Sequence, residues 1–153
     1  MGVIFIVVLI AGGIFLGYAY HISQALNKES KEYTDIVVPK VLSGWDAAMF
    51  DQYADHNAMK DANLTPQQMA QIFAWSKNTL GNMTEYLGSA GEAYVRRAGN
   101  MRMTGAQYMA YAKFQHGEAK ILVTLTKNAN GDWKIAGFNV NSPSFTNIPT
   151  PYR

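Results

Sequence analysis

The sequence predicts an α+β protein, with an N-terminal transmembrane helix followed by a small domain of helices packed on a curved antiparallel sheet. Three observations lead to this class. The first twenty residues carry no charged side chain. Apolar residues then recur at helical spacing as far as Leu80, and from Tyr94 onward they alternate with the period of two that is typical of strands. Helices that precede a run of antiparallel strands form a layered α+β domain.

The apolar leader has the length of a membrane span, because a helix of about twenty residues covers roughly 30 Å. We therefore expect residues 1–21 to be an anchor in a bacterial inner membrane. The alternative is a secretory signal cleaved after Ala19, since Gly17 and Ala19 place small residues at the −3 and −1 positions. The retained anchor is favoured because no Lys or Arg precedes the apolar run and the run exceeds a typical signal core.

Within the leader, Gly13 and Gly17 form a GxxxG pattern, which leaves a flat strip where a second helix can approach closely. Glycine is also common in membrane helices generally, so the alternative interpretation is that these two glycines contact no second helix. Tyr18, Tyr20 and His21 are expected at the membrane interface. The first charges beyond them, from Lys28 to Glu32, are mixed in sign, and we expect the single-pass protein to hold its domain in the periplasm.

After the anchor we expect a stalk at 22–34, a domain at 35–142 and a proline-rich extended tail at 143–153. Thr34 and Asp35 are expected to cap the domain's first helix, with Pro39 in its first turn. One continuous apolar face follows at helical spacing, made by Val38, Val41, Leu42, Trp45, Ala48, Met49 and Tyr53. The polar segment 55–64 is expected to be a linker.

The second helix has a clear start and end. Thr65 is the expected N-cap, Pro66 the first helical residue and Gln68 the capping-box partner, and Gly81 is the expected C-cap. Strands follow, with hairpin turns predicted at His116-Gly117 and at Asn130-Gly131, the second of type I′. The alternation shifts at Ala136-Gly137, which predicts a β-bulge in the last strand.

This order of elements resembles the nuclear-transport-factor-2-like superfamily, most closely its small membrane-tethered or secreted bacterial members. The resemblance covers roughly residues 35–142. It depends on the stretch from Trp45 to Tyr53, the TPQQM helix start at Thr65, the NGDWKI hairpin at Asn130 and the pair Gly137-Phe138. It implies a sheet curled around the helices to form a cone with an interior cavity. Catalytic members equip that cavity with an acid and a base, but no spacing here identifies a matching pair.

Two groups of side chains are candidate sites. Arg96, Arg97 and Arg102 form a candidate basic patch toward lipid headgroups or an acidic partner, unless they are simply a solvated sheet edge. Aromatic residues at helical and strand spacing either line a cone cavity or form an ordinary core, and these are Trp45, Tyr53, Phe73, Tyr108, Phe114, Trp133 and Phe138. His56 lies near Asp51 and Asp61 in sequence, but a solvated loop explains it better than a metal site.

The amino-acid composition excludes several classes of function. The net charge is +2 without a long basic run, so no nucleic-acid partner is expected. The absence of cysteine excludes disulfides and thiolate catalysis, and no cofactor or metal is expected. The sequence therefore predicts a non-enzymatic, single-span accessory subunit that docks on an integral membrane protein complex through its anchor, domain and tail. The alternatives are a membrane-tethered small-molecule binder or enzyme that uses the cone cavity, and a secreted domain.

Overall fold

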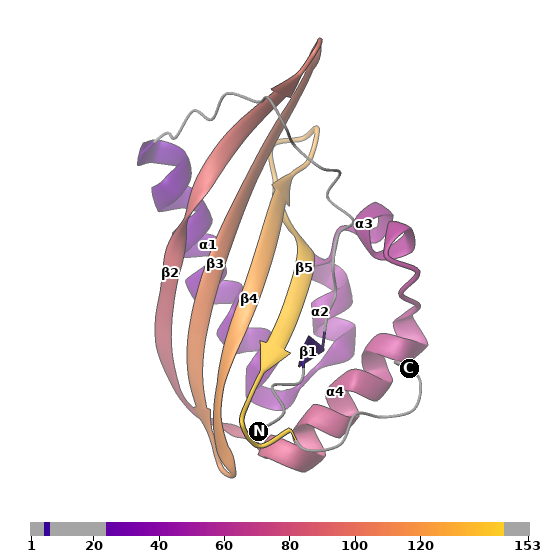
Figure 1. Cartoon of the computed structure of the whole chain (residues 1–153), viewed down its shortest axis with the longest axis vertical. Helices are drawn as coiled ribbons and strands as arrows, with labels where there is room; N and C mark the ends of the chain where they lie inside the picture. Colours follow the sequence, from indigo (N-terminus) through magenta and orange to yellow (C-terminus); the bar gives the residue numbers. More distant parts are fainter. Residues whose placement is uncertain (1–4, 7–23, 146–153) are drawn as a thin grey trace.

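The computed structural model describes residues 5–6 and 24–145, in which a layer of helices covers one face of an antiparallel sheet (Figure 1). The helices come first, and they are α1 (Gln24–Gly44), α2 (Ala47–Tyr53), α3 (His56–Asp61) and α4 (Pro66–Leu80). A meander of strands follows, made by β2 (Met83–Ala98), β3 (Met101–Phe114), β4 (Gly117–Lys127) and β5 (Trp133–Asn141). The predicted α+β class is confirmed.

The leader contributes two described residues, which form strand β1 (Phe5–Ile6) beside β5 at one edge of the sheet. At these two positions the structure differs from the predicted membrane helix, because their backbones pair with Asn141 and Val140. The predicted helix-contact and interface residues Gly13, Gly17, Tyr18, Tyr20 and His21 lie outside the described residues. In the ranges that are described, no helix is both long enough and apolar enough to cross a bilayer.

Helix α1 begins earlier than predicted and passes through the expected boundary between stalk and domain. Thr34 does not cap a helix, because it is buried within α1 and its hydroxyl donates to the Ser30 carbonyl at 2.8 Å. Pro39 lies inside the helix instead of in its first turn. A proline in a helix interior costs about 3 kcal/mol, and the burial of Val38 and Val41 on the core-facing side of α1 offsets that cost.

The single amphipathic helix expected up to Tyr53 is broken after Gly44 into α1 and α2. Trp45 has a positive φ of 52°, which no helical residue adopts, and Asp46 then caps α2 by accepting from the Met49 N–H at 3.0 Å. The predicted linker 55–64 is also partly helical. Asp55 caps α3 by accepting from the Asn57 and Ala58 N–H groups, so its local hydrogen bonds start a helix in a polar segment.

The predicted ends of α4 are confirmed. Thr65 and Gln68 form the reciprocal capping box, Pro66 is the first helical residue, and Gly81 ends the helix with a φ of 77°. The predicted bulge is confirmed too, because Thr124 pairs with Gly137 and Leu125 with Ile135, which leaves Ala136 as the extra residue in β5.

The last hairpin turn is longer than predicted. Gly131 has a positive φ, but among the described residues Asn130 does not share it, so the two-residue type I′ turn is wrong. Instead the side chain of Asn128 accepts from the N–H groups of Asn130 and Asp132 and organises the loop 128–132. Side-chain hydrogen bonds of this kind are how Asn replaces a backbone turn.

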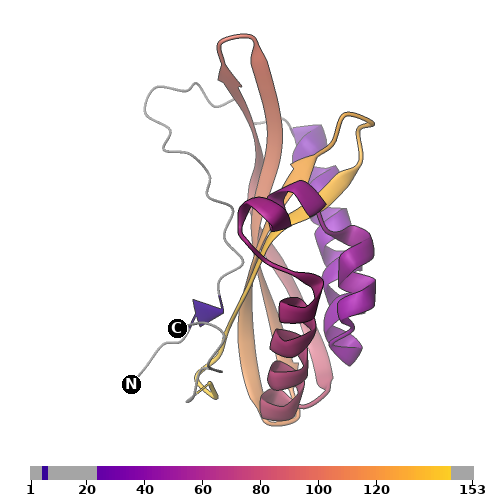
Figure 2. The same cartoon turned by 90° about the vertical axis from the view of Figure 1, so that its right-hand side faces the viewer.

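The core lies between the sheet and the helices, which Figure 2 shows on one side of the strands. Helix α1 packs along β2 and β3, and Phe50 of α2 and Phe73 of α4 fill the space over β5. The start of the predicted tail folds back onto this layer, where Phe145 is fully buried with its ring 4.6 Å from that of Trp75. The rest of the tail, from residue 146, lies outside the described residues.

Candidate functional sites

The predicted pocket aromatics form a packed core and do not line an open cone. The Phe73 and Phe138 rings lie 6.1 Å apart, and Phe50 contacts both with centroid distances of 5.4 Å. All of the candidates are buried except Tyr53, which is partly buried against them. Ring spacings of 4.5–7 Å are those of packed aromatic pairs. The interior between helices and sheet is therefore filled by side chains at these positions.

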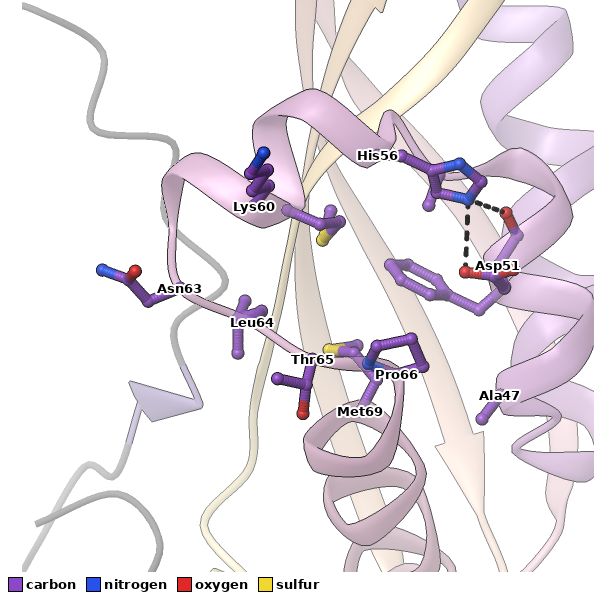
Figure 3. Close-up of a pocket in the computed structure, with 12 residues that line it drawn as sticks. Ala47, Asp51, His56, Lys60, Asn63, Leu64, Thr65, Pro66 and Met69 are labelled. Carbon is purple, nitrogen blue, oxygen red and sulfur yellow. Dashed lines mark hydrogen bonds and ion pairs between the residues drawn. The ribbon is translucent and has the colours of Figure 1, made fainter.

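A separate pocket lies between α2, α3 and the start of α4 and has a volume of about 570 Å³ (Figure 3). Its walls are mainly apolar, from Phe50, Met59 and Met69, all of them buried. Polar residues stand at two sides, Asp51 and His56 at one and Lys60 and Asn63 at the other. The sequence did not predict this pocket, because it depends on α3 folding in the segment expected to be a linker.

The histidine at this pocket is paired with a carboxylate. His56 Nε2 lies 3.2 Å from Asp51 Oδ1 and 3.1 Å from the Asp51 carbonyl oxygen, and both side chains are exposed. Asp61, the third residue near them in sequence, does not line the pocket. Across residues 5–6 and 24–145, no group of three or more acidic or histidine side chains is arranged to hold a metal ion.

A polar cluster joins α1 to β2. Asp35 Oδ1 accepts from the Tyr86 hydroxyl at 2.8 Å and the Ser89 hydroxyl at 2.6 Å, and Lys31 donates to Oδ2 at 2.6 Å. Burial raises the pKa of Asp35, but the hydrogen bonds from Lys31, Ser89 and Tyr86 outweigh burial and hold its pKa below the usual value. Burial and the neighbouring Asp35 carboxylate raise the pKa of Tyr86 well above its usual range.

Two large exposed apolar side chains adjoin residues of this polar cluster in the chain, Ile36 after Asp35 and Leu87 after Tyr86. Ile36 on α1 is 55% exposed and Leu87 on β2 is 50% exposed. Leu87 sits at a break in the β2–β3 register between Tyr86 and Gly88, so it has no cross-strand partner. We call Ile36 and Leu87 the edge patch, because β2 is the terminal strand of the sheet. The sequence did not predict a site at either residue.

The candidate basic residues lie at the tip of the β2–β3 hairpin, which projects beyond the other strands (Figures 1 and 2). Arg97 pairs directly with Arg102 across the two strands, so the structure brings these two predicted residues together. Arg96 is opposite Met103 and its guanidinium lies 4.5 Å from the Tyr94 ring centroid. Because side chains alternate along a strand, Arg96 lies on the other face of the hairpin.

Comparison of the chain with protein-family models, with curated proteins and with solved structures finds no match.

Proposed function

We propose that this protein is a single-span accessory subunit of a larger membrane protein complex in a bacterial inner membrane, with its α+β domain in the periplasm. The edge patch carries this proposal, because it offers a partner two exposed apolar side chains beside a terminal strand. The order of helices and antiparallel strands also supports the proposed kinship with the nuclear-transport-factor-2-like superfamily.

The membrane part of the proposal depends on the composition of residues 1–21. A charge-free run of this length is long enough to span a bilayer, and its insertion would bury every one of its apolar side chains. The two-residue pairing of β1 with β5 contributes few backbone hydrogen bonds by comparison. In the inserted state that we propose, Phe5 and Ile6 leave β5 and join the membrane helix.

The domain part depends on the edge of the sheet. A long terminal strand presents backbone groups to any passing chain, and proteins usually cover or interrupt such an edge. Here Asn27 of α1 covers one position by accepting from the Ala93 N–H at 2.6 Å, and Asp35 of α1 binds the Tyr86 side chain of the same strand. The edge patch lies beside this covered region and leaves Ile36 and Leu87 in solvent. Exposed apolar side chains at an edge are suited to a partner protein.

The partner is tested by native purification of the full chain from membranes in mild detergent. Replacing both edge-patch residues by serine should remove the co-purifying proteins, whereas Met103→Ser should retain them in detergent. Met103 is a matched control because it is also a large apolar side chain with 50% exposure, equal to that of Leu87, but it pairs with Arg96 near the far end of β3. A chain that purifies alone in its wild-type form contradicts the proposal.

The anchor is tested separately. Intact mass of the natively purified protein should include residues 1–19, and the protein should resist alkaline carbonate extraction. Loss of those residues would instead favour the secreted domain cleaved after Ala19. Gly13→Leu with Gly17→Leu should leave the protein in the membrane but weaken the complex, because bulky side chains prevent close approach of a second helix.

The pocket of Figure 3 favours a second candidate function, the binding of a small apolar molecule. Its volume and apolar walls with a few polar groups are typical of ligand sites. Ala47 lines the pocket, so Ala47→Phe should fill part of it and reduce binding of an apolar fluorescent probe. Equal probe binding by the variant would exclude this site.

A further inference from the structure

The tip of the β2–β3 hairpin combines paired arginines with exposed methionines. Gly99 turns the chain with a φ of 58°, and the strand positions next to the turn are paired as Ala98 with Met101 and Arg97 with Arg102. Met101 is 67% exposed and Met103 is 50% exposed, the former being the most exposed of the large apolar side chains in the described residues. Both methionines therefore leave at least half of their surface in solvent.

The arrangement of the two arginines favours an anionic partner. Like charges directly opposite each other on neighbouring strands destabilise a hairpin. Neither Arg97 nor Arg102 forms an ion pair with another residue in the described ranges. An oxyanion between the two guanidinium groups would relieve their repulsion, and phosphate oxygens match the geometry of the guanidinium group.

The exposed methionines indicate that the anionic partner is a membrane surface. Strand alternation places Met101 and Met103 on the opposite face of the hairpin from Arg97 and Arg102. Apolar side chains that enter the boundary between headgroups and acyl chains, beside cations that hold anionic headgroups, are the two components of interfacial membrane binding. Methionine suits this boundary because its unbranched chain adapts to irregular apolar surroundings.

The position of the tip in the fold points to the same partner. The hairpin projects at the end of the domain where α1 begins (Figures 1 and 2). Only residues 22 and 23 separate Gln24, the first residue of α1, from the span proposed at residues 1–21. The start of α1 therefore lies near the bilayer surface if that span is inserted, and the tip faces the same surface.

We propose that the β2–β3 hairpin tip docks on a bilayer that contains anionic lipids. Arg97 and Arg102 bind lipid phosphates, and Met101 and Met103 enter the headgroup region. This contact is a second attachment besides the anchor, and it fixes the orientation of the domain over the membrane. The inference rests on the proposed membrane function, but the experiment below separates the two.

The test uses the full chain, whose lack of cysteine allows a single label. A fluorophore is attached at Asn100→Cys in the tip, or at His116→Cys in the turn at the opposite end of the domain. Each protein is reconstituted in vesicles of phosphatidylcholine alone or with phosphatidylglycerol, in both cases with a lipid-borne nitroxide quencher. The Asn100 label should be quenched strongly with phosphatidylglycerol and weakly without it, and the His116 label should be quenched in neither.

Three double variants, one of them a control, test the residues of the tip. Arg97→Gln with Arg102→Gln should shift the equilibrium roughly 30-fold toward the undocked tip, at about fivefold for each arginine near an anionic surface. Lys40→Gln with Lys77→Gln removes the same charge from exposed positions at the other end of the domain and should change nothing. Met101→Ser with Met103→Ser should also reduce quenching, but independently of the anionic lipid.

Several outcomes overturn the proposal. The first is a carbonate-resistant protein whose Asn100 label is quenched no more than its His116 label in phosphatidylglycerol vesicles. The second is an Asn100 label that stays exposed there but is shielded in the natively purified complex, which would assign the tip to an acidic protein. If carbonate extracts the protein, the proposal of a membrane anchor is wrong. The proposal for the tip then stands only if the wild type floats with phosphatidylglycerol vesicles and the double arginine variant does not.

Discussion

The indole N–H of Trp45 donates to the Gly81 carbonyl at 2.9 Å, which joins the break after α1 to the end of α4. The same ring stacks on Phe114, with centroids 5.2 Å apart, so one side chain connects both helix ends to β3. Its backbone adopts a positive φ, which costs a non-glycine residue of order 1–3 kcal/mol. The contacts of the indole hold Trp45 in this conformation.

Trp45→Phe should therefore destabilise the domain. The smaller ring keeps much of the packing but leaves the Gly81 carbonyl, which is partly buried, without its donor. A fully buried unsatisfied group costs about 1–3 kcal/mol, so we expect a loss at the lower end, about 1 kcal/mol. Urea unfolding should show a lower free energy of unfolding by this amount. A free energy equal to that of the wild type would mean that the hydrogen bond contributes nothing to the break between α1 and α2.

Gly91→Ala should be strongly destabilising. A Cβ at Gly91 would lie 2.0 Å from the Gln107 carbonyl oxygen, a backbone atom of the paired strand that cannot move aside cheaply. We expect a loss of about 2 kcal/mol or more, within the range of overpacking effects. Gly44→Ala is the matched control, because a Cβ there meets nothing within 4 Å and its φ is not positive. Similar melting temperatures for the two variants would contradict the prediction.

Asp35 should make the stability of the domain depend on pH. Its pKa is lower in the folded chain than in the unfolded chain, so the unfolded state binds more protons as the pH falls. The stabilisation is present above the unfolded pKa, near 3.9 for an ordinary aspartate, and is lost as the pH falls through the folded value. Denaturant unfolding from pH 6 downward, a range of roughly 3 pH units, should show this loss in the wild type.

Asp35→Asn should show a smaller loss over the same range, because the amide does not titrate. Tyr86→Phe removes one of the three hydrogen-bond donors to Asp35. Its pH profile of stability should therefore lie between those of the wild type and Asp35→Asn. Parallel pH profiles for the wild type and Asp35→Asn would show that other carboxylates cause the acid sensitivity.

Asp55→Ala should loosen α3 and, with it, the pocket. The Asp55 carboxylate caps α3 and also accepts from the Thr126 hydroxyl of β4 at 3.0 Å. Loss of an N-cap costs about 1 kcal/mol. Hydrogen exchange should therefore accelerate at residues 58–62 while α4 stays protected. Asp61→Ala, at the other end of α3, is the comparison variant and should leave exchange in α3 close to that of the wild type.

Local signals in the chain determined several elements by themselves. The capping box at Thr65, the C-cap at Gly81, the strand alternation and the bulge at Ala136 all depend on residues close in sequence. The basic residues at 97 and 102 also become neighbours through a short hairpin, so their clustering follows from a local turn. Such features are predictable because the interactions that create them span only a few residues.

Tertiary contacts decided the rest. Helical spacing continues through Trp45, and the break there is held by its bond to Gly81, 36 residues away, and by its stacking on Phe114. Likewise α1 keeps Pro39 in its interior because its buried face packs on β2 and β3. The polar cluster joins Asp35 to side chains 51 and 54 residues later, which no periodicity in the sequence relates. The leader's charge-free composition predicts a membrane span, whereas the edge patch and the direction of the hairpin tip exist only once the sheet has formed.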